Sequence, residues 1–383
     1  MKKLVGIFFI FFSIAAAAQL DTSNKQNCSL RISLLTCTPG QELYSTFGHS
    51  AIRVLNLQTG SDLVYNYGTF YFDDPYFIQK FIHGNLDYFI SVDSFSLFIW
   101  EYKYYRRGVT EQVLHLSCEE KNKIEAALFE NIKEVNKYYR YDFTFDNCTT
   151  RLRDLLKNNS TNSIQSKNIL PTKNTSFRNL LHVYLNKTNR NWSKLGIDIL
   201  LGSPLDKTIS NREAAYLPEY LLRTVDSSST NNGQLVLEKS VLLPETDFPN
   251  TNSFFTPLLF FSIFFLLVVV LSFIKAANSF LKFFDFVLFF LCGALGFFLI
   301  YMGYFTAHSM FKNNFNLLWA TPTHFVAALL LFRNKHWVKK YFRISFFIHL
   351  FLIFAWFFLP QQMNIALLPF TGIILLRTFF ISK

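Results

Sequence analysis

Cys148 is the residue of this sequence best suited to covalent chemistry, and it lies in residues 141–151, which read YDFTFDNCTTR. Three leucines follow it at helical spacing, so we expect Cys148 in the first turn of a helix capped by Asp146 or Asn147. Unpaired backbone N–H groups and the positive end of the helix dipole favour a thiolate over a thiol at such a position. The stretch therefore predicts a cysteine nucleophile.

A cysteine nucleophile needs a base, and the best candidate is His49, far upstream in the chain. Residues 50–57 and 63–68 are predicted to form a β-hairpin on which His49 and Arg53 share one face. Asn66, on the partner strand, would then lie beside His49 and orient its imidazole by a hydrogen bond, unless it is a polar residue on a solvated face. Arg53 is either a bidentate clamp for a phosphate or carboxylate, or a plain surface arginine.

Other side chains of the same types leave two alternatives open. In the first, a different histidine serves Cys148, and three more lie in the same half of the chain: His83, His115 and His182. In the second, Cys148 forms a structural disulfide, because an oxidising compartment allows two cysteines to pair. The remaining cysteines are Cys28, Cys37, Cys118 and Cys292.

The composition argues against a nucleic-acid-binding protein, despite a formal net charge of +11. Many of the lysines and arginines flank apolar segments, where positive charge marks the cytoplasmic side of a membrane. No zinc-finger, helix-turn-helix or glycine-rich phosphate-binding motif accompanies the charge. The sequence also has no HExxH motif and no clustered metal ligands, so we expect neither a nucleic-acid partner nor a metal site.

Apolar segments at both ends of the chain predict export and membrane insertion. Residues 1–18 have the basic start, apolar core and small-residue cleavage site of a signal peptide. We expect residues 19–250 to form an exported α+β domain and residues 251–383 an all-α membrane bundle. Its five apolar segments span residues 254–274, 283–306, 317–332, 342–359 and 365–380. Basic residues collect in the links predicted to lie inside, which places the catalytic domain on the periplasmic side of the inner membrane.

Three further segments on the predicted outer side have an unusual composition. Residues 65–70 and 77–90 are rich in aromatic side chains, which form either a rim facing lipid or part of the core. Residues 307–319 make an unusually polar link between two apolar segments. This link either positions a substrate by hydrogen bonds or is an ordinary wet loop, and its candidate groups are His308, Asn314 and Asn316.

Three motifs closely resemble one family: CTPGQELYSTFGHSAIR at residues 37–53, YNYGTF at 65–70 and DNCTTR at 146–151. The family is the Lnb-type lipoprotein N-acyltransferases of Gram-negative envelopes, and residues 308–319 are similar to its membrane half. The resemblance covers nearly the whole chain. It implies a papain-like exported domain of the permuted NlpC type, in which the histidine precedes the cysteine, followed by a membrane bundle of about five transmembrane helices.

The resemblance also implies a site for lipid acyl transfer. Cys148 and His49 would be catalytic, with Asn66 as the third member. Groups expected to bind the substrates are Arg53, Tyr67, Arg151, His308, Asn314 and Asn316. In the implied reaction Cys148 takes an acyl chain from a membrane phospholipid as a thioester and passes it to the N-terminal amine of a diacylglyceryl-cysteine lipoprotein. A thioester is activated enough for attack by an amine, so no cofactor is required.

Two other functions stay open on the sequence alone. A membrane-anchored cysteine peptidase or amidase acting on cell-wall peptides would use the same Cys–His pair, although five spans exceed what an anchor needs. A non-enzymatic, lipid-binding protein of envelope assembly would hold Cys148 in a disulfide. The free-thiol state of Cys148 separates this last function from both enzymes.

Overall fold

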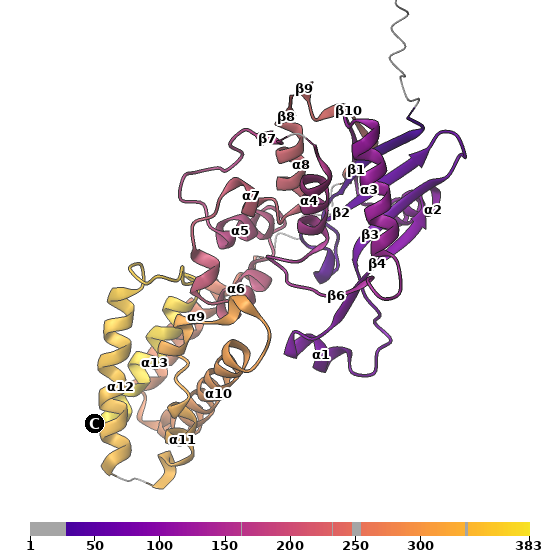
Figure 1. Cartoon of the computed structure of the whole chain (residues 1–383). Helices are drawn as coiled ribbons and strands as arrows, with labels where there is room; N and C mark the ends of the chain where they lie inside the picture. The colour runs from indigo at the N-terminus through magenta and orange to yellow at the C-terminus, as the bar shows by residue number, and fades with distance from the viewer. Residues whose placement is uncertain (1–27, 162, 232, 247–253, 334–335) are drawn as a thin grey trace, which may run out of the picture.

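The computed structural model describes residues 28–383 with the exception of 162, 232, 247–253 and 334–335. The expected signal peptide and the expected domain boundary at residues 250 and 251 lie outside the described residues. A region built on a β-sheet is followed by a region of long helices, and α5 (Phe177–Lys187) and α6 (Asn191–Leu200) lie between them (Figure 1).

The first region is organised around a seven-stranded antiparallel sheet with the order β10-β5-β1-β2-β3-β4-β6. The strands are β1 (Leu30–Cys37), β2 (His49–Asn56), β3 (Asp62–Thr69), β4 (Asp87–Ser94), β5 (Val109–Leu114), β6 (Tyr138–Arg140) and β10 (Val236–Leu243). All residues of β1 except Arg31 are buried, as expected for a central strand that is covered on both faces.

Helices cover both faces of this sheet. They are α2 (Phe95–Tyr104), α3 (Cys118–Asn131), α4 (Cys148–Asn159) and α8 (Pro218–Asp226). Successive residues of a strand point to opposite faces, so Ile52 of β2 joins the core beneath α3 and α4, which includes Leu152. Its neighbour Ala51 joins the smaller core beneath α2, which includes Phe98. The start of β2 is thereby fixed from both sides, next to the start of α4.

The expected hairpin of β2 and β3 is confirmed, with Ile52 opposite Tyr65. Helix α2 and strand β10 are among the elements of the sheet region that were not expected. Helix α2 follows directly on β4 and is capped by the Ser94 hydroxyl, which accepts a hydrogen bond from the Leu97 N–H at 3.3 Å. Strand β10 comes more than a hundred residues after β5, with which it pairs, and no local pattern indicates such a distant partner.

The second region contains α9 (Pro257–Ser272), α10 (Asn278–Tyr304), α11 (Thr323–Leu329), α12 (His336–Ala355) and α13 (Leu367–Ser382). The segment Lys275–Tyr304 is long and apolar enough to cross a membrane, and α9 and α13 are shorter apolar helices. The expected apolar segment 317–332 is not one continuous helix. Its helix α11 begins only after Pro322, because proline has no N–H to donate and disfavours helical geometry in the residue before it.

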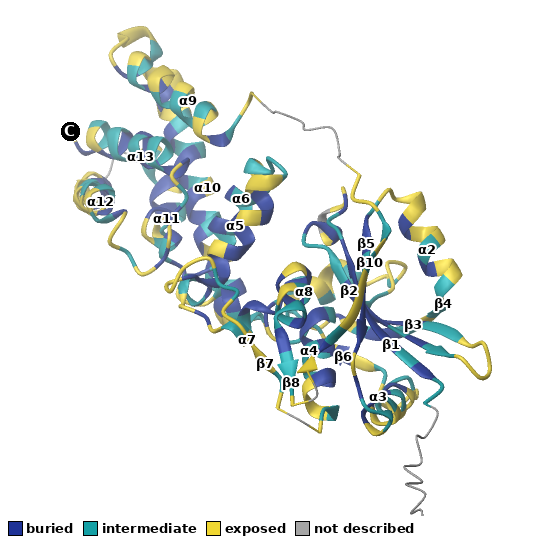
Figure 2. Ribbon diagram, turned by 90° about the horizontal axis from the view of Figure 1, so that it is seen from above, coloured by how far each residue is buried: buried dark blue, intermediate teal, exposed yellow. Residues whose placement is uncertain are grey.

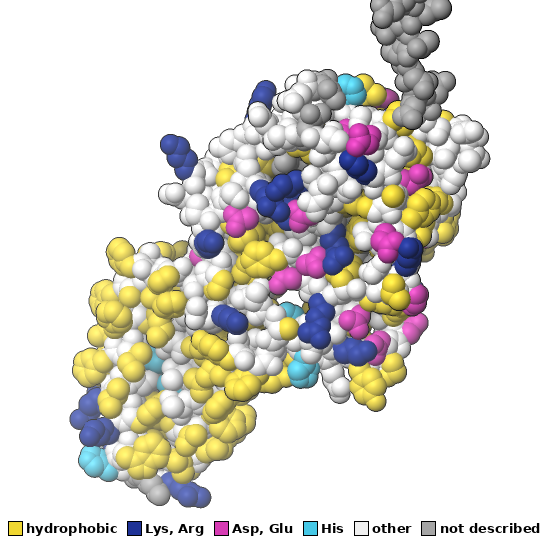
Figure 3. All heavy atoms as spheres, in the orientation of Figure 1, with side chains coloured by type: hydrophobic (Ala, Val, Ile, Leu, Met, Phe, Trp, Pro, Cys, Tyr) yellow, Lys and Arg dark blue, Asp and Glu magenta, His cyan; other side chains and the backbone are white. Residues whose placement is uncertain are grey.

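The two regions differ in surface character. Hydrophobic side chains cover the helical region, and lysines and arginines gather at its end far from the sheet (Figure 3). Exposed residues lie along the outward sides of α9 and α12 (Figure 2), and they include Ile263, Phe351 and Phe354. A continuous apolar surface of this kind indicates contact with lipid rather than water.

Candidate active site

Asn147 begins α4 and places Cys148 at its N-terminus. The Asn147 side-chain oxygen accepts hydrogen bonds from the N–H groups of Thr149 and Thr150, both at 2.8 Å. The Thr150 hydroxyl accepts one from the Asn147 N–H at 2.7 Å, and the Asn147 amide nitrogen donates to the Tyr216 carbonyl at 3.0 Å. This capping box confirms that the cap is Asn147. The Cys148 N–H has no acceptor among the described residues, so it is available to a bound molecule.

The side chains of Cys148 and His49 interact, and this interaction acts on the pKa of the thiol. Burial by itself would raise the pKa of the Cys148 thiol, but the charge and hydrogen bond of His49, with help from the Ser50 N–H, lower that pKa from 9.0 to about 7. The Thr149 hydroxyl, 3.7 Å from Sγ, acts in the same direction. Roughly half of the thiol is therefore ionised near neutral pH.

Asn66 holds the imidazole of His49 from the other side. His49 Nε2 lies 3.2 Å from Asn66 Oδ1, and Asn66 Nδ2 donates to Asp93 Oδ2 at 3.0 Å. Because an amide oxygen only accepts, Nε2 is the protonated nitrogen, and Nδ1 is the nitrogen left to act as a base. Asp93, Asn66 and His49 thus form an ordered series of hydrogen bonds, and its last member, His49, interacts with Cys148.

Two glycines bring the sheet close to this pair. Gly48 has a φ of +84°, and a Cβ on it would lie 2.6 Å from the Cys37 carbonyl oxygen. Gly68 has a φ of +89°, and a Cβ on it would lie 3.4 Å from the Cys148 Cβ and 3.6 Å from the Tyr141 ring. Only glycine adopts such backbone angles without strain, so both positions allow β2 and β3 to approach the start of α4.

The other histidines of the sheet region have partners elsewhere. His83 Nε2 lies 2.7 Å from the Tyr301 hydroxyl, and His182 Nε2 lies 2.8 Å from Asp198 Oδ1. His115 Nδ1 is 3.3 Å from a backbone oxygen. The geometry therefore favours His49 as the base for Cys148.

The five cysteines are all free thiols in the structure. Cys37 is buried, and burial raises the pKa of its thiol to about 12. Cys28 and Cys118 are hydrogen-bonded to each other. Cys148 thus differs from the other exported cysteines in its lowered pKa, which is the property a nucleophile needs.

The guanidinium of Arg53 is occupied within the sheet region. Its Nε and Nη2 donate to the Asp62 carboxylate at 2.8 and 2.7 Å, and Nη1 donates to Glu111 at 3.0 Å. The same group lies 3.4 Å from the ring centroid of Phe95. Contact between Arg53 and a substrate stays a prediction.

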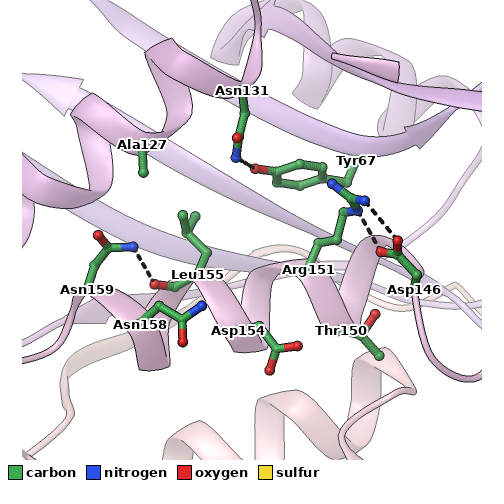
Figure 4. Close-up of a pocket in the computed structure, with 10 residues that line it drawn as sticks. All are labelled: Tyr67, Ala127, Asn131, Asp146, Thr150, Arg151, Asp154, Leu155, Asn158 and Asn159. Carbon is green, nitrogen blue, oxygen red and sulfur yellow. Dashed lines mark hydrogen bonds and ion pairs between the residues drawn. The ribbon is translucent and has the colours of Figure 1, made fainter. Parts of the chain in front are cut away.

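Tyr67 and Arg151 line a cavity of about 310 Å³ beside α4 (Figure 4). Arg151 donates two hydrogen bonds to the Asp146 carboxylate at 2.6 and 2.8 Å and lies 3.5 Å from the ring centroid of Tyr139. The Tyr67 hydroxyl accepts from Asn131 Nδ2 at 2.6 Å. Cys148 is not among the residues that line this cavity, so a direct role of Tyr67 or Arg151 in substrate binding also stays a prediction.

The polar link 307–319 is bound to the sheet region rather than open to solvent. Asn314 and Asn316 are buried, and both donate to backbone carbonyls at the end of α6, the former at 2.8 and 3.0 Å and the latter at 2.9 and 3.1 Å. His308 Nε2 lies 3.0 Å from the Phe81 carbonyl oxygen. The contacts of these three side chains join the two regions, and their contact with a substrate stays a prediction.

Asp198 is the centre of that junction. Its carboxylate accepts hydrogen bonds from Arg178, His182 and Asn364, each at 2.8 Å. Arg178 is fully buried and Asp198 nearly so, and the pair lies between α5 and α6. A second cavity of about 500 Å³ lies beside it, between α5 and the link before α13. The junction is therefore a buried polar cluster held by hydrogen bonds and an ion pair.

Two family models match the chain. One is described as the Lnb N-terminal periplasmic domain and matches residues 16–183, and the other, the Lnb transmembrane domain, matches residues 249–383. Together they cover most of the sequence in the expected order. The chain belongs to the Lnb family of lipoprotein N-acyltransferases. No curated protein and no solved structure was found to match it significantly.

Membership in the Lnb family confirms the resemblance seen in the motifs and gives each region its place. The sheet-rich α+β region is the periplasmic domain, the helical region is the transmembrane domain, and the protein is an acyltransferase of the inner membrane. Cys148 and His49 both lie within the matched periplasmic domain.

Asp93 is the site residue that sequence reasoning missed. It lies on β4, where Val64 of β3 is its partner in the ladder. The contact is diagonal, because the partner of Asn66 in the ladder is Ser91, so it is visible only once the register of the two strands is known. One sequence feature could have pointed to Asp93: side chains alternate between the two faces of a strand, so Ser91 and Asp93 lie on the same face of β4.

Proposed function

We propose that this protein transfers a fatty acyl chain from a membrane phospholipid to the N-terminal amine of a diacylated lipoprotein, through a thioester on Cys148. The observation that supports this most is the series Asp93, Asn66, His49 and Cys148 at the start of α4. A thiol with a lowered pKa, a base held in one tautomer and an unbonded N–H are the parts that acyl transfer requires.

In the first step the Cys148 thiolate attacks the carbonyl carbon of a phospholipid ester. The tetrahedral oxyanion takes a hydrogen bond from the Cys148 N–H, at the positive end of α4. The ester C–O bond then breaks, and the departing oxygen receives the proton held by His49 Nδ1. The products are a thioester on Cys148 and a lysophospholipid.

In the second step the neutral α-amine of the lipoprotein attacks the thioester carbonyl. His49, now neutral, takes a proton from the attacking nitrogen, and the same N–H stabilises the oxyanion. The C–S bond breaks, which releases the amide product and restores the thiolate beside a protonated His49. Acyl group, electrons and protons balance over the two steps without a cofactor.

The membrane domain brings the thiol to its substrates. Both are lipids, and holding Cys148 at the bilayer surface removes much of the entropic cost of their encounter. We propose that the hydrogen bonds of Asn314 and Asn316 to α6 fix the height of the catalytic domain above the membrane. In this proposal Tyr67, Arg151, Arg53 and His308 bind the substrates, and His308 also contacts the Phe81 carbonyl.

In this proposal the orientation of the protein in the membrane follows from the positions of its lysines and arginines. The exported domain covers residues 19–250 after removal of a signal peptide, and α9 to α13 provide five passages, with the broken α11 segment as the third. Lys339, Lys340 and Arg343 lie in the first half of α12, and Figure 3 shows lysines and arginines gathered at the end of the helical region far from the sheet. Positive residues stay on the cytoplasmic side, which puts Cys148 in the periplasm.

The test is the mass of lipoprotein N-termini in cells that lack any other N-acyltransferase. Cells with the wild-type protein or with Cys118→Ala are expected to carry triacylated lipoproteins. Cells with Cys148→Ala or His49→Ala are expected to accumulate the diacylated form at equal protein levels. Triacylated lipoproteins in the Cys148→Ala cells would overturn the proposal.

A further inference from the structure

An exposed aromatic segment, residues 70–83, has no role in the reaction described so far. It includes α1 (Phe77–His83), a helix without a buried residue. Five of its large apolar side chains are between 53% and 70% exposed, namely Tyr71, Phe72, Tyr76, Ile78 and Phe81. A protein surface in water rarely presents such a patch. We call residues 70–83 the aromatic arm.

The aromatic arm is fastened to the last turn of the longest apolar helix. His83 Nε2 lies 2.7 Å from the Tyr301 hydroxyl, and the Ala307 N–H donates to the His83 carbonyl at 2.9 Å. Tyr301 is three residues from the end of α10 at Tyr304, which is about 5 Å along a helix. Figure 1 shows α1 away from the sheet, on the side that faces α10. The arm therefore lies at the level of the bilayer surface.

A run of rings connects the aromatic arm to the nucleophile. Their centroids follow one another at 4.3 to 6.2 Å in the order Phe81, Phe77, Phe70, Tyr88 and Tyr141. The last ring, that of Tyr141, lies beside Gly68 and Cys148. Burial raises the pKa of Tyr88 to about 12 and that of Tyr141 well above its usual value. The run is therefore apolar from the arm to the thiol.

We propose that the aromatic arm inserts into the outer leaflet and that its rings guide the acyl chain of a phospholipid from the bilayer to Cys148. The bonds to α10 place the arm against lipid, and aromatic side chains favour the membrane interface. Its lysine, Lys80, is paired with Asp74 at 2.6 Å, which reduces the cost of approaching the acyl region. This inference rests on the proposed function, because it takes Cys148 as the acyl acceptor.

The depth of the aromatic arm can be measured without any reaction. A nitroxide is attached to Ile78→Cys or Phe72→Cys in the full chain, in a background without the accessible cysteines, within vesicles of phosphatidylethanolamine and phosphatidylglycerol. Matched labels at Leu57→Cys and Leu237→Cys report on equally exposed apolar sites of the sheet region, 65% and 67% exposed. We expect oxygen to relax the arm labels more than a water-soluble nickel chelate does, and the reverse at the controls. Stronger relaxation by the chelate at both arm positions would overturn the proposal.

The role in guiding the chain is tested by the ratio of two rates. Thioester formation from vesicle phospholipid is compared with the reaction of a short, water-soluble nitrophenyl ester. Phe72→Asn with Ile78→Asn should lower this ratio about tenfold, because each side chain loses its transfer into lipid. Leu57→Asn with Leu237→Asn should leave the ratio unchanged, and an unchanged ratio in the arm variant would overturn the proposal.

The two tests also separate this inference from the proposed function. If Cys148 is not the nucleophile, no thioester forms on it in any variant, while the nitroxide labels still report whether the arm enters the bilayer. If Cys148 is the nucleophile and the arm stays in water, N-acylation persists and only this inference fails.

Discussion

The Nε2 atom of His49 lies 3.2 Å from the Oδ1 atom of Asn66, and this contact decides which imidazole nitrogen can act as the base. The amide oxygen accepts only, so Nε2 carries the hydrogen and Nδ1 is left to take the proton of the thiol. Asn66 is held in turn by Asp93 at 3.0 Å. Asn66 is therefore a positioning residue that acts on Cys148 through His49.

Replacing Asn66 with alanine should slow catalysis without weakening substrate binding. The ring of His49 loses its acceptor, and misplacement of a catalytic group by about 1 Å costs on the order of 100-fold in rate. We expect kcat with a soluble nitrophenyl ester to fall about 10- to 100-fold and KM to stay unchanged. Gln58→Ala, at an exposed turn, serves as the control. A defect confined to KM would argue against a positioning role.

The pH dependence of thiol alkylation should report the pKa of Cys148. The lowered value of about 7 means that thiolate is lost as the pH falls below 7 and is nearly complete above 8. The iodoacetamide rate should therefore rise to a plateau with a midpoint near 7. In His49→Gln the midpoint should move toward the ordinary 9.0, which lowers the rate at neutral pH about 50-fold. A wild-type midpoint near 9 contradicts the pairing with His49.

The substitution Gly48→Ala should be more damaging than Gly60→Ala, although the two glycines have similar backbone angles. Gly48 and Gly60 have φ of +84° and +73°, but a Cβ at Gly60 meets no atom within 4 Å. Alanine at either position costs about 1–2 kcal/mol of backbone strain. Gly48→Ala also drives a carbon to 2.6 Å from the Cys37 carbonyl oxygen, so it should lower the melting temperature further and slow the ester reaction by moving His49. Equal losses in both variants would show that the contact is relieved elsewhere.

The buried pair at the domain junction should be far more costly to break than a surface pair. Arg178→Met leaves the Asp198 carboxylate buried without its main cation, which typically costs about 3–5 kcal/mol. Arg212→Met removes an exposed partner of Asp154 and should cost less than about 1 kcal/mol. Thermal unfolding in detergent compares the two variants. A similar small loss in both would mean that the junction does not stabilise the fold.

Local features of the site could be predicted from the sequence, because short spacings determine them. The cap at Asn147 and the hairpin that carries His49 and Asn66 depend on residues a few positions apart. The contact with Asp93 depends on the register of β3 against β4, in which Asn66 is opposite Ser91 and Asp93 is opposite Val64. Helix α1 lies between these strands in the chain, and the pattern within either strand does not determine their register.

In the membrane half, too, local features could be predicted from the sequence and long-range contacts could not. Its apolar helices were located from composition, but the break at Pro322 divides the expected third segment. Asn314 and Asn316 attracted attention as polar groups between apolar segments. Their partners in α6 lie more than a hundred residues away, and only the fold reveals that they join the two domains.

The most direct test of the acyl-enzyme is the mass of the peptide that contains Cys148. The purified protein is incubated in phospholipid vesicles without an acceptor and then digested under acid conditions. We predict a fatty acyl group on Cys148 that neutral hydroxylamine removes, that an acceptor lipopeptide discharges, and that is absent from Cys148→Ser. An unmodified Cys148 in a preparation that still N-acylates the lipopeptide when it is added would contradict the account.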